Sequence, residues 1–185
     1  AASDVYKRQR WTYRSAIVAR TDARISFARF TGLRAAWVDP LSLGGHLLAV
    51  AHLRHRGIDP SSAFVSQRFE GSHPGVLSAV LHGSADVGAV SISADDEEAI
   101  RAGLSMHGGP AAQALSVVGV TAEAPNDALV LTAKLGEDRA RAIMDKLFDA
   151  RSARAPSLIL SAMDAEGFVR AAPGTYAAIT ALVRT

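Results

Sequence analysis

The sequence contains no cysteine, so its 185 residues can form neither a disulfide nor a metal site built on thiolates. It also lacks any apolar run long enough to cross a bilayer as a helix. Neither sign of charge dominates: 20 basic and 18 acidic residues are interspersed and leave a formal charge of +2, which argues against a nucleic-acid partner. The missing cysteine does not decide the cellular compartment, since exported bacterial proteins often lack it too.

The composition is that of an ordinary globular protein with one or two lobes, because 49% of the residues are hydrophobic and 21% are charged. The N-terminus differs from the rest of the chain. It carries charges without a following apolar stretch, so it is not a secretory signal, and it runs into a strand-like segment without a turn. We expect residues 1–11 to be a foreign or disordered head, and true upstream sequence to be missing.

Segments of strand length alternate with segments of helical period through the first half of the chain. Short apolar or β-branched runs bounded by turn residues predict strands at 13–20, 33–39, 63–70 and 85–92. Longer apolar runs that end at glycine predict helices at 44–56 and 74–82. This alternation predicts an α/β fold with a parallel-rich sheet and helices on both faces.

The second half of the chain is more mixed. Strand-like runs predict strands at 115–125 and 127–135, and the glycines before them predict a loop at 107–113. Acidic starts and apolar periodicity predict helices at 94–104, 136–150, 156–163 and 174–183. The helix at 136–150 has the clearest apolar stripe, formed by Ala140, Ile143, Met144, Leu147 and Phe148.

One strand-to-helix turn carries a serine and two glycines. Ser42 stands where it can cap the next helix, and Gly44 and Gly45 would let a ligand approach the free amides of its first turn. Those amides lie at the positive end of the helix dipole, so they suit an anion. The same residues also suit an ordinary strand-to-helix loop, and their spacing matches neither a P-loop nor a dinucleotide fingerprint.

A second strand-to-helix turn places Ser72 and His73 directly before Pro74, a residue that suits the first turn of a helix. Parallel strands end at one edge of a sheet, and open α/β sheets bind their ligands outside that edge. The two turns together therefore favour one anion site more than either turn does alone. Helix capping by Ser72 is the alternative that these residues leave equally open.

The sequence offers no catalytic or metal-binding constellation. Ser72 and His73 are adjacent, an arrangement poorly suited to proton transfer, and the chain has no G-x-S-x-G turn. The six histidines are scattered along the chain: His46, His52, His55, His73, His82 and His107. We therefore expect no catalytic residue, no metal and no cofactor.

Several segments together resemble a known family. The order of “YRSAIVAR”, “GLRAAWVDPLSLGGHLL”, “FEGSHPGVLSAVLHGSADVGAV” and “PNDALVLTAKL” is similar to that in phosphate, phosphite and phosphonate substrate-binding proteins of ABC transporters. More broadly, residues 13–168 resemble type II periplasmic binding proteins. The resemblance implies two α/β lobes joined by two crossing strands, with an oxyanion held in the cleft between the lobes.

By this resemblance the chain is an N-terminally truncated fragment of a two-lobed protein. Residues 12–20 would be the first hinge strand, 20–126 one complete ligand-binding lobe, and 127–134 the return hinge strand. Residues 135–185 would then be the C-terminal helices of an incomplete second lobe, with an exposed apolar surface.

The resemblance also implies a set of ligand-binding residues. These are Ser42, Leu43, Gly44, Gly45, Ser72, His73 and Ser91. Ser42 matches the first of three consecutive hydroxyl residues in the family's loop, but the next two positions lack a hydroxyl. Ser72 and His73 match the family's “GSH” motif, whereas Ser91 replaces an acidic residue that meets an amine in aminophosphonates. These departures favour an anion site made largely of backbone donors.

The predicted function is that of the substrate-binding component of an ABC transporter, located in the periplasm or elsewhere outside the cytoplasm. Its partners would be a small oxyanion and a membrane permease, with no nucleic acid. The effector-binding domain of a transcriptional regulator with the same general fold is the alternative, and an anion-using enzyme is a more distant one. With one lobe mostly absent, we expect this chain to bind its ligand weakly or not at all.

Overall fold

The computed structural model describes residues 12–126, 128, 130–148, 158, 160, 161, 171, 172 and 174–183. These residues divide into two compact units. The larger contains residues 12–126 and 176–183, and the smaller contains the described residues from 128 to 175. All seven predicted ligand-binding residues belong to the larger unit.

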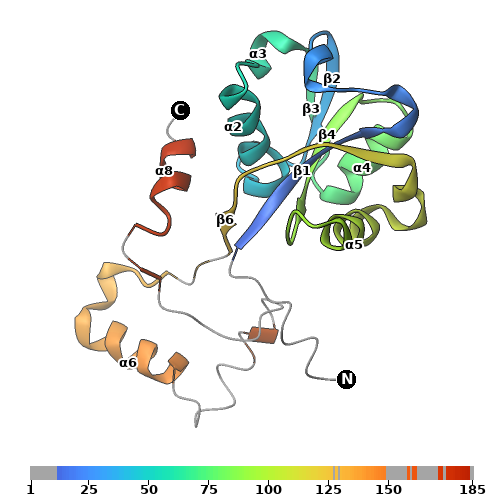
Figure 1. Ribbon diagram of the computed structural model, residues 1–185. Helices are drawn as coiled ribbons and strands as arrows, with labels where there is room; N and C mark the ends of the chain where they lie inside the picture. Colours follow the sequence, from blue (N-terminus) through green and yellow to red (C-terminus); the bar gives the residue numbers. More distant parts are fainter. Residues whose placement is uncertain are drawn as a thin grey trace. The chain divides into compact units, whose positions relative to one another are not determined.

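A sheet of mixed direction forms the centre of the larger unit (Figure 1). Its strands are β1 (Thr12–Arg20), β2 (Leu33–Trp37), β3 (Phe64–Phe69), β4 (Val87–Ile92), β5 (Leu115–Val120) and the short β6 (Ala124–Pro125). The order across the sheet is β3-β2-β4-β1-β5, and β6 pairs with β1. β2 is parallel to β3 and β4, whereas β1 is antiparallel to β4 and β5. The other five strands therefore share one direction, and β1 runs against them.

Helices cover both faces of this sheet (Figure 1). The α-helices of the larger unit are α2 (Leu48–His55), α3 (Pro60–Ala63), α4 (His73–Leu81), α5 (Glu97–Gly108) and α8 (Ala177–Val183). A π-helix, Leu43–Leu47, leads directly into α2, and 3-10 turns occupy Thr21–Ala23, Phe27–Arg29 and Gly109–Ala114. α2 packs on one face of the sheet, and α4 and α5 pack on the other. Burial of both faces is the usual state of a parallel-rich sheet.

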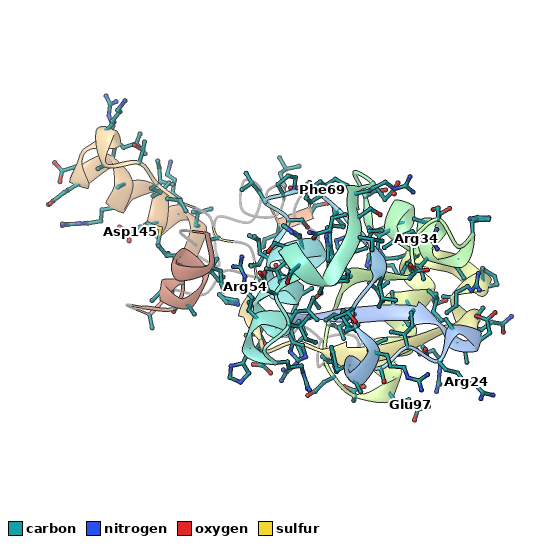
Figure 2. All side chains as sticks on the ribbon, turned by 90° about the horizontal axis from the view of Figure 1, so that it is seen from above. Arg24, Arg34, Arg54, Phe69, Glu97 and Asp145 are labelled. Atoms are coloured by element: carbon teal, nitrogen blue, oxygen red, sulfur yellow. The ribbon has the colours of Figure 1, made fainter. Side chains whose placement is uncertain are left out.

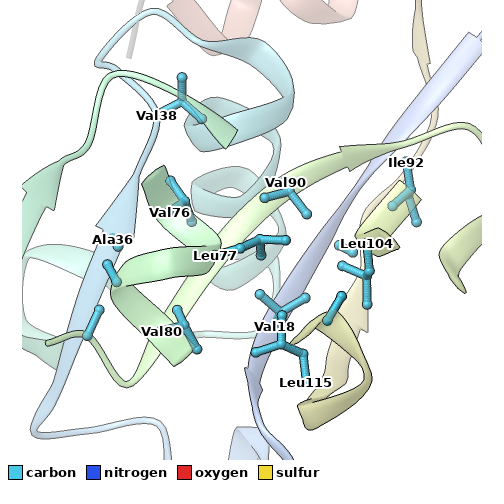
Figure 3. Packing of buried hydrophobic residues seen from close by; sticks show 14 residues of the cluster. Val18, Ala36, Val38, Val76, Leu77, Val80, Val90, Ile92, Leu104 and Leu115 are labelled. Atoms are coloured by element: carbon cyan, nitrogen blue, oxygen red, sulfur yellow. The ribbon is translucent and has the colours of Figure 1, made fainter. Parts of the chain in front are cut away.

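The two faces of β1 belong to two separate hydrophobic clusters. Ala16 and Val18 join the cluster beneath α4 and α5, whereas Ile17 and Ala19 join the cluster beneath α2. All four are fully buried, because successive side chains of a strand point to opposite faces. Figure 3 shows the first cluster, which strands β1, β2, β4 and β5 form with helices α4 and α5.

Charged side chains lie on the outside of the larger unit. The labelled Arg24, Arg34 and Glu97 project from separate parts of its surface (Figure 2). Arg34 is paired with Asp86 at 2.7 Å between Nη2 and Oδ1. This placement leaves the two clusters almost entirely apolar.

The structure confirms the predicted α/β fold with its parallel-rich sheet. The predicted strands at 13–20, 33–39, 63–70 and 85–92 correspond to β1, β2, β3 and β4, and the predicted helices at 44–56 and 74–82 are also present. The helix α3 was not predicted. It forms because Asp59 caps it, accepting a hydrogen bond from Ser61 N at 3.1 Å, and because Pro60 suits its first position.

Two predicted elements are wrong. The loop expected at 107–113 is instead the end of α5 followed by a 3-10 helix. The strand expected over 127–135 is not a strand in its described residues. Residues 128 and 130–132 have no regular secondary structure, and Ala133–Leu135 is a 3-10 turn. A strand needs a partner strand for its backbone groups, and these described residues pair with none.

The smaller unit contains helix α6 (Glu137–Phe148), which confirms the predicted helix at 136–150 over its described residues. No residue of α6 is buried, and Ile143 on its predicted apolar stripe is 37% exposed. Val130, ahead of the helix, is 81% exposed. The smaller unit therefore has little hydrophobic core among its described residues.

The boundaries of the predicted lobes differ from those of the two units. Residues 177–183 were expected in the second lobe, but α8 groups with the larger unit. There the Tyr176 hydroxyl donates a hydrogen bond to the carbonyl of Asn126 at 3.0 Å. The head at 1–11 and most of the helix expected at 156–163 lie outside the described residues. The hinge and lobe assignments remain predictions.

Candidate functional site

The parallel strands β2, β3 and β4 end at the same edge of the sheet, and backbone hydrogen bonds join the loops after β2 and β3. Gly71 N donates to the carbonyl of Val38 at 2.8 Å, and Val38 N donates to the carbonyl of Gly45 at 3.1 Å. Glu70 N also donates to the carbonyl of Trp37 at 2.8 Å. The two predicted turns therefore lie side by side rather than on opposite sides of the unit.

The first loop leads into the π-helix, which begins after Ser42. The Ser42 hydroxyl oxygen accepts a hydrogen bond from Gly45 N at 3.1 Å, and the Ser42 carbonyl accepts one from Leu47 N at 3.0 Å. The N–H groups of Leu43 and Gly44 lie in the first turn of this helix. The first N–H groups of a helix have no hydrogen-bond partner within it. π-Helices are rare and often occur at functional sites.

Close packing, rather than backbone angles, requires glycine at positions 44 and 45. A Cβ on Gly45 would lie 2.2 Å from Val38 Cγ2. A Cβ on Gly44 would lie 2.9 Å from Cε2 of Tyr13 and 3.0 Å from Cβ of Ser91. Both glycines are buried. The first loop therefore lies directly against β4 at Ser91.

The second loop begins α4 and aims a histidine at the same serine. The Ser72 hydroxyl oxygen caps the helix by accepting from Gly75 N at 3.1 Å, which leaves the hydroxyl proton available to a ligand. Nδ1 of His73 lies 3.4 Å from Ser91 N, and Nε2 lies 3.4 Å from Ser91 Oγ. Capping by Ser72 is confirmed, and it positions His73 over β4.

A histidine that the sequence did not indicate completes this cluster. His107, in the last turn of α5, stacks on His73 with ring centroids 4.7 Å apart and planes inclined by 24°. Its Nε2 lies 3.4 Å from Ser91 Oγ and 3.3 Å from the Ser91 carbonyl oxygen. No sequence motif predicts this contact, because the packing direction of α5 decides where His107 lies.

Both imidazoles are held toward the neutral form. Burial lowers the pKa of His73 below the ordinary value of 6.5, His107 lowers it further, and Asp39 acts in the opposite direction. Burial also lowers the pKa of His107, against the hydrogen bond that its ring donates to the Ser91 carbonyl, which raises it. The two stacked rings would repel each other as cations, so protonation of one ring disfavours protonation of the other.

Ser15 of β1 anchors the first loop through a side-chain hydrogen bond. This fully buried residue donates its hydroxyl proton to the Gly44 carbonyl at 2.6 Å, and its N–H donates to Thr121 Oγ1 at 3.0 Å. Thr121 N donates in turn to the Ser15 carbonyl at 3.0 Å. Ser15 therefore holds the loop of Gly44 against the strand that the family resemblance identifies as the first hinge.

Ser15→Ala should lower the free energy of unfolding by about 1–3 kcal/mol, because the buried Gly44 carbonyl would lose its donor. The matched control is Ser116→Ala, which removes only a 3.5 Å bond from a partly buried hydroxyl to the Ala19 carbonyl. This control should cost much less. Urea denaturation followed by circular dichroism measures both variants, and equal losses would contradict the positioning role of Ser15.

The structure brings three of the predicted residues together, because Gly44 and His73 each lie against Ser91. The remaining predicted residues form the two loops that carry them: Ser42, Leu43, Gly45 and Ser72. Sequence reasoning missed Ser15 and His107. His107 comes from a helix without a recognisable motif, and Ser15 comes from “YRSAIVAR”, a segment of the family resemblance that did not indicate a site residue.

Other features of the described residues lie away from this cluster. A shallow depression at the other end of β1 is lined by Arg20, Thr21, Asp22, Arg24 and Ala114. The described residues include no group of three or more histidine, aspartate and glutamate side chains placed to hold a metal ion. None of the described helices combines the length and the apolar character that a bilayer span needs.

Comparison with known proteins extends over nearly the whole chain. The family model of the periplasmic substrate-binding proteins of phosphonate ABC transporters matches residues 2–176. No curated protein matches the chain.

Three solved structures share the fold. PhnD1 from Prochlorococcus marinus, in complex with methylphosphonate, is 19% identical with a TM-score of 0.65, over 93% of this chain and 66% of its own. XAC2383 from Xanthomonas citri, bound to ATP, is 21% identical with a TM-score of 0.71, over 94% of this chain and 65% of its own. PA3383 from Pseudomonas aeruginosa, a binding protein component of an ABC phosphonate transporter, is 22% identical with a TM-score of 0.68. That match covers 94% of this chain and 57% of PA3383.

The chain thus spans at most 66% of the length of these structures. Their similarity confirms the predicted resemblance to periplasmic binding proteins at the level of the fold. The family model goes further, because it matches almost every residue of this sequence. The chain belongs to the family of periplasmic substrate-binding proteins of phosphonate ABC transporters.

Proposed function

We propose that this chain contains the ligand-binding lobe of a periplasmic ABC-transporter component, and that it captures a small oxyanion of the phosphonate, phosphite or phosphate type. The observation that carries the proposal is the convergence of Gly44, His73 and Ser91 at one edge of the sheet. Each position can offer an N–H or O–H group to a negatively charged oxygen. Family membership supports this role, since the family consists of substrate-binding transport components and not of enzymes.

The donors at this edge suit a tetrahedral anion. The first-turn amides of the π-helix and of α4 lie at the positive ends of their helices, and the hydroxyls of Ser72 and Ser91 can each donate one hydrogen bond. Asp39 is the acidic group that acts on His73. Its Oδ1 already accepts a hydrogen bond from Leu41 N at 2.8 Å, so this carboxylate helps to build the first loop.

Capture would follow the two-lobed mechanism that the family resemblance implies. The larger unit supplies one set of donors, and a second lobe supplies the rest as it closes over the ligand in an interlobe cleft. Closure would exclude water and shift an open–closed equilibrium that a membrane permease senses. This chain spans at most 66% of the length of the structures that share its fold. We therefore expect its dissociation constant for methylphosphonate to lie above the micromolar range.

Amide chemical shifts of the 185-residue chain, followed while methylphosphonate is added, test this function. We expect the shifts to concentrate at Gly44, Gly45, Ser72 and Ser91. His73→Ala should weaken binding roughly tenfold to hundredfold, since a hydrogen bond to a charged group contributes about 1.5–3 kcal/mol. Micromolar binding by this chain would contradict the expected need for a second lobe.

His82→Ala is the matched control for His73→Ala. His82 follows the C-terminal end of α4, and its exposed ring is hydrogen-bonded to Ser78 one turn earlier. This variant should bind methylphosphonate as the wild-type chain does. Shifts confined to the end of β1 near Arg20, or no shifts at all, would contradict the proposed function.

A further inference from the structure

Two imidazoles from different helices converge on one hydroxyl group at the candidate site. Nε2 of His73 and Nε2 of His107 each lie 3.4 Å from Ser91 Oγ. The rings also stack on each other, with centroids 4.7 Å apart. An anionic oxygen beside the Ser91 hydroxyl would therefore be within reach of both rings.

The charged groups around His73 and His107 do not hold the two rings in the protonated form, so a bound ligand can decide whether the pair carries a proton. Burial lowers the pKa of both rings below 6.5, so the pair is neutral at pH 7. The other titratable or charged groups near this edge include Tyr13, Arg14, Asp39, His46, Glu70, Asp95 and Glu123. Arg14 is paired with Asp95 at 3.5 Å and with Glu123 at 2.9 Å, so these three groups together keep one net negative charge. Asp39 alone draws a proton toward His73.

We propose that His107 is a ligand-binding residue of this site, where it and His73 together take up one proton when a doubly charged oxyanion binds. The inference rests on the proposed function and extends it to the charge state of the ligand. An anion within about 4–6 Å of an imidazole stabilises the imidazolium form. Only one ring of the pair is protonated, because two stacked cations would repel each other. The neutral ring remains hydrogen-bonded to Ser91.

Proton uptake sets the sign of the pH dependence. The ligand raises the pKa of the pair above its value in the free protein, so binding takes up a proton in the pH range between these two values. The affinity for a dianion then rises as the pH falls through that range, by at most about tenfold per pH unit for one proton. The site would therefore select oxyanions that remain doubly charged near neutral pH.

Imidazole nitrogen chemical shifts of the full chain, recorded against pH with and without methylphosphonate, test this inference. They report the protonation of each histidine separately from the titration of the ligand. We expect methylphosphonate to move the signals of both rings and to raise the midpoint of the pair by about 1–3 pH units. This measurement needs no variant, so it decides the question even if a substitution prevents folding.

His107→Asn should weaken methylphosphonate binding about tenfold or more, because it removes one donor to the anion. His55→Asn, on the exposed face of α2, is the matched control and should bind as wild type. Methylphosphonate binding by the wild-type chain without movement of the His107 signals, or unchanged affinity in His107→Asn, would overturn the inference but not the proposed function. No binding by the wild-type chain would overturn both.

Discussion

Replacing Trp37 with alanine should lower the free energy of unfolding by about 3–5 kcal/mol, because it leaves a large cavity beneath α2. Trp37 ends β2 and is fully buried. Its ring centroid lies 5.8 Å from that of Phe64 and 5.5 Å from that of His46. Its indole N–H also donates to Gln67 Oε1 at 2.9 Å. The change therefore removes packing and a hydrogen bond directly before the first loop of the candidate site.

Urea denaturation followed by far-ultraviolet circular dichroism measures this loss without relying on the fluorescence of the residue that is removed. For a chain of this length, the expected loss corresponds to a fall in Tm of roughly 10 °C. The matched control is Trp37→Phe, which keeps most of the buried ring but not the indole N–H. It should cost less than half as much as Trp37→Ala. Similar losses in the two variants would show that the bond to Gln67, rather than packing, carries the energy.

Replacing Gly45 with valine should cost about 3 kcal/mol or more, at the upper end of the range for overpacked interiors. A Cβ at this position would lie 2.2 Å from Val38 Cγ2 and 2.6 Å from Val38 Cβ. Val38 belongs to the buried cluster beneath α4 and α5, so it cannot move aside without shifting its neighbours. The loop would move instead, together with the bond from Gly45 N to Ser42 Oγ. We therefore expect Gly45→Val to lose both stability and methylphosphonate binding.

A double-mutant cycle tests whether the collision with Val38 causes this loss. Val38→Ala removes the two γ-methyl groups, so it should destabilise the wild-type chain but relieve part of the strain in Gly45→Val. The double variant should be more stable than the sum of the single changes by at least about 0.5 kcal/mol. Urea denaturation of the four chains measures the coupling. Strict additivity would contradict the predicted contact.

Local features were the ones that the sequence predicted well. The caps at Ser42 and Ser72 each join residues three positions apart, so they follow from short motifs that stand before a helix. The strand β1 was predictable for a similar reason, because “YRSAIVAR” is apolar on both of its faces and suits only a strand buried on both sides. The convergence of the two turns followed from a general rule of parallel sheets.

The errors concern residues whose structure depends on distant partners. Residues 127–135 have the composition of a strand, yet their described part pairs with no strand of the sheet. Residues 107–113 contain two glycines and a proline, yet they continue α5 and form a 3-10 helix that packs on it. Propensity is a weak guide where tertiary contacts decide whether backbone groups find partners.

By itself, the sequence determined the strands β1 to β4, the helices expected at 44–56 and 74–82, the two helix caps and the family to which the chain belongs. Only the tertiary structure decided what surrounds Ser91. The contacts that assemble the site join residues 16 positions apart for His107 and Ser91, and 29 apart for Ser15 and Gly44. Such contacts depend on how α5 and the π-helix pack against the sheet, and no short pattern of residues specifies that packing.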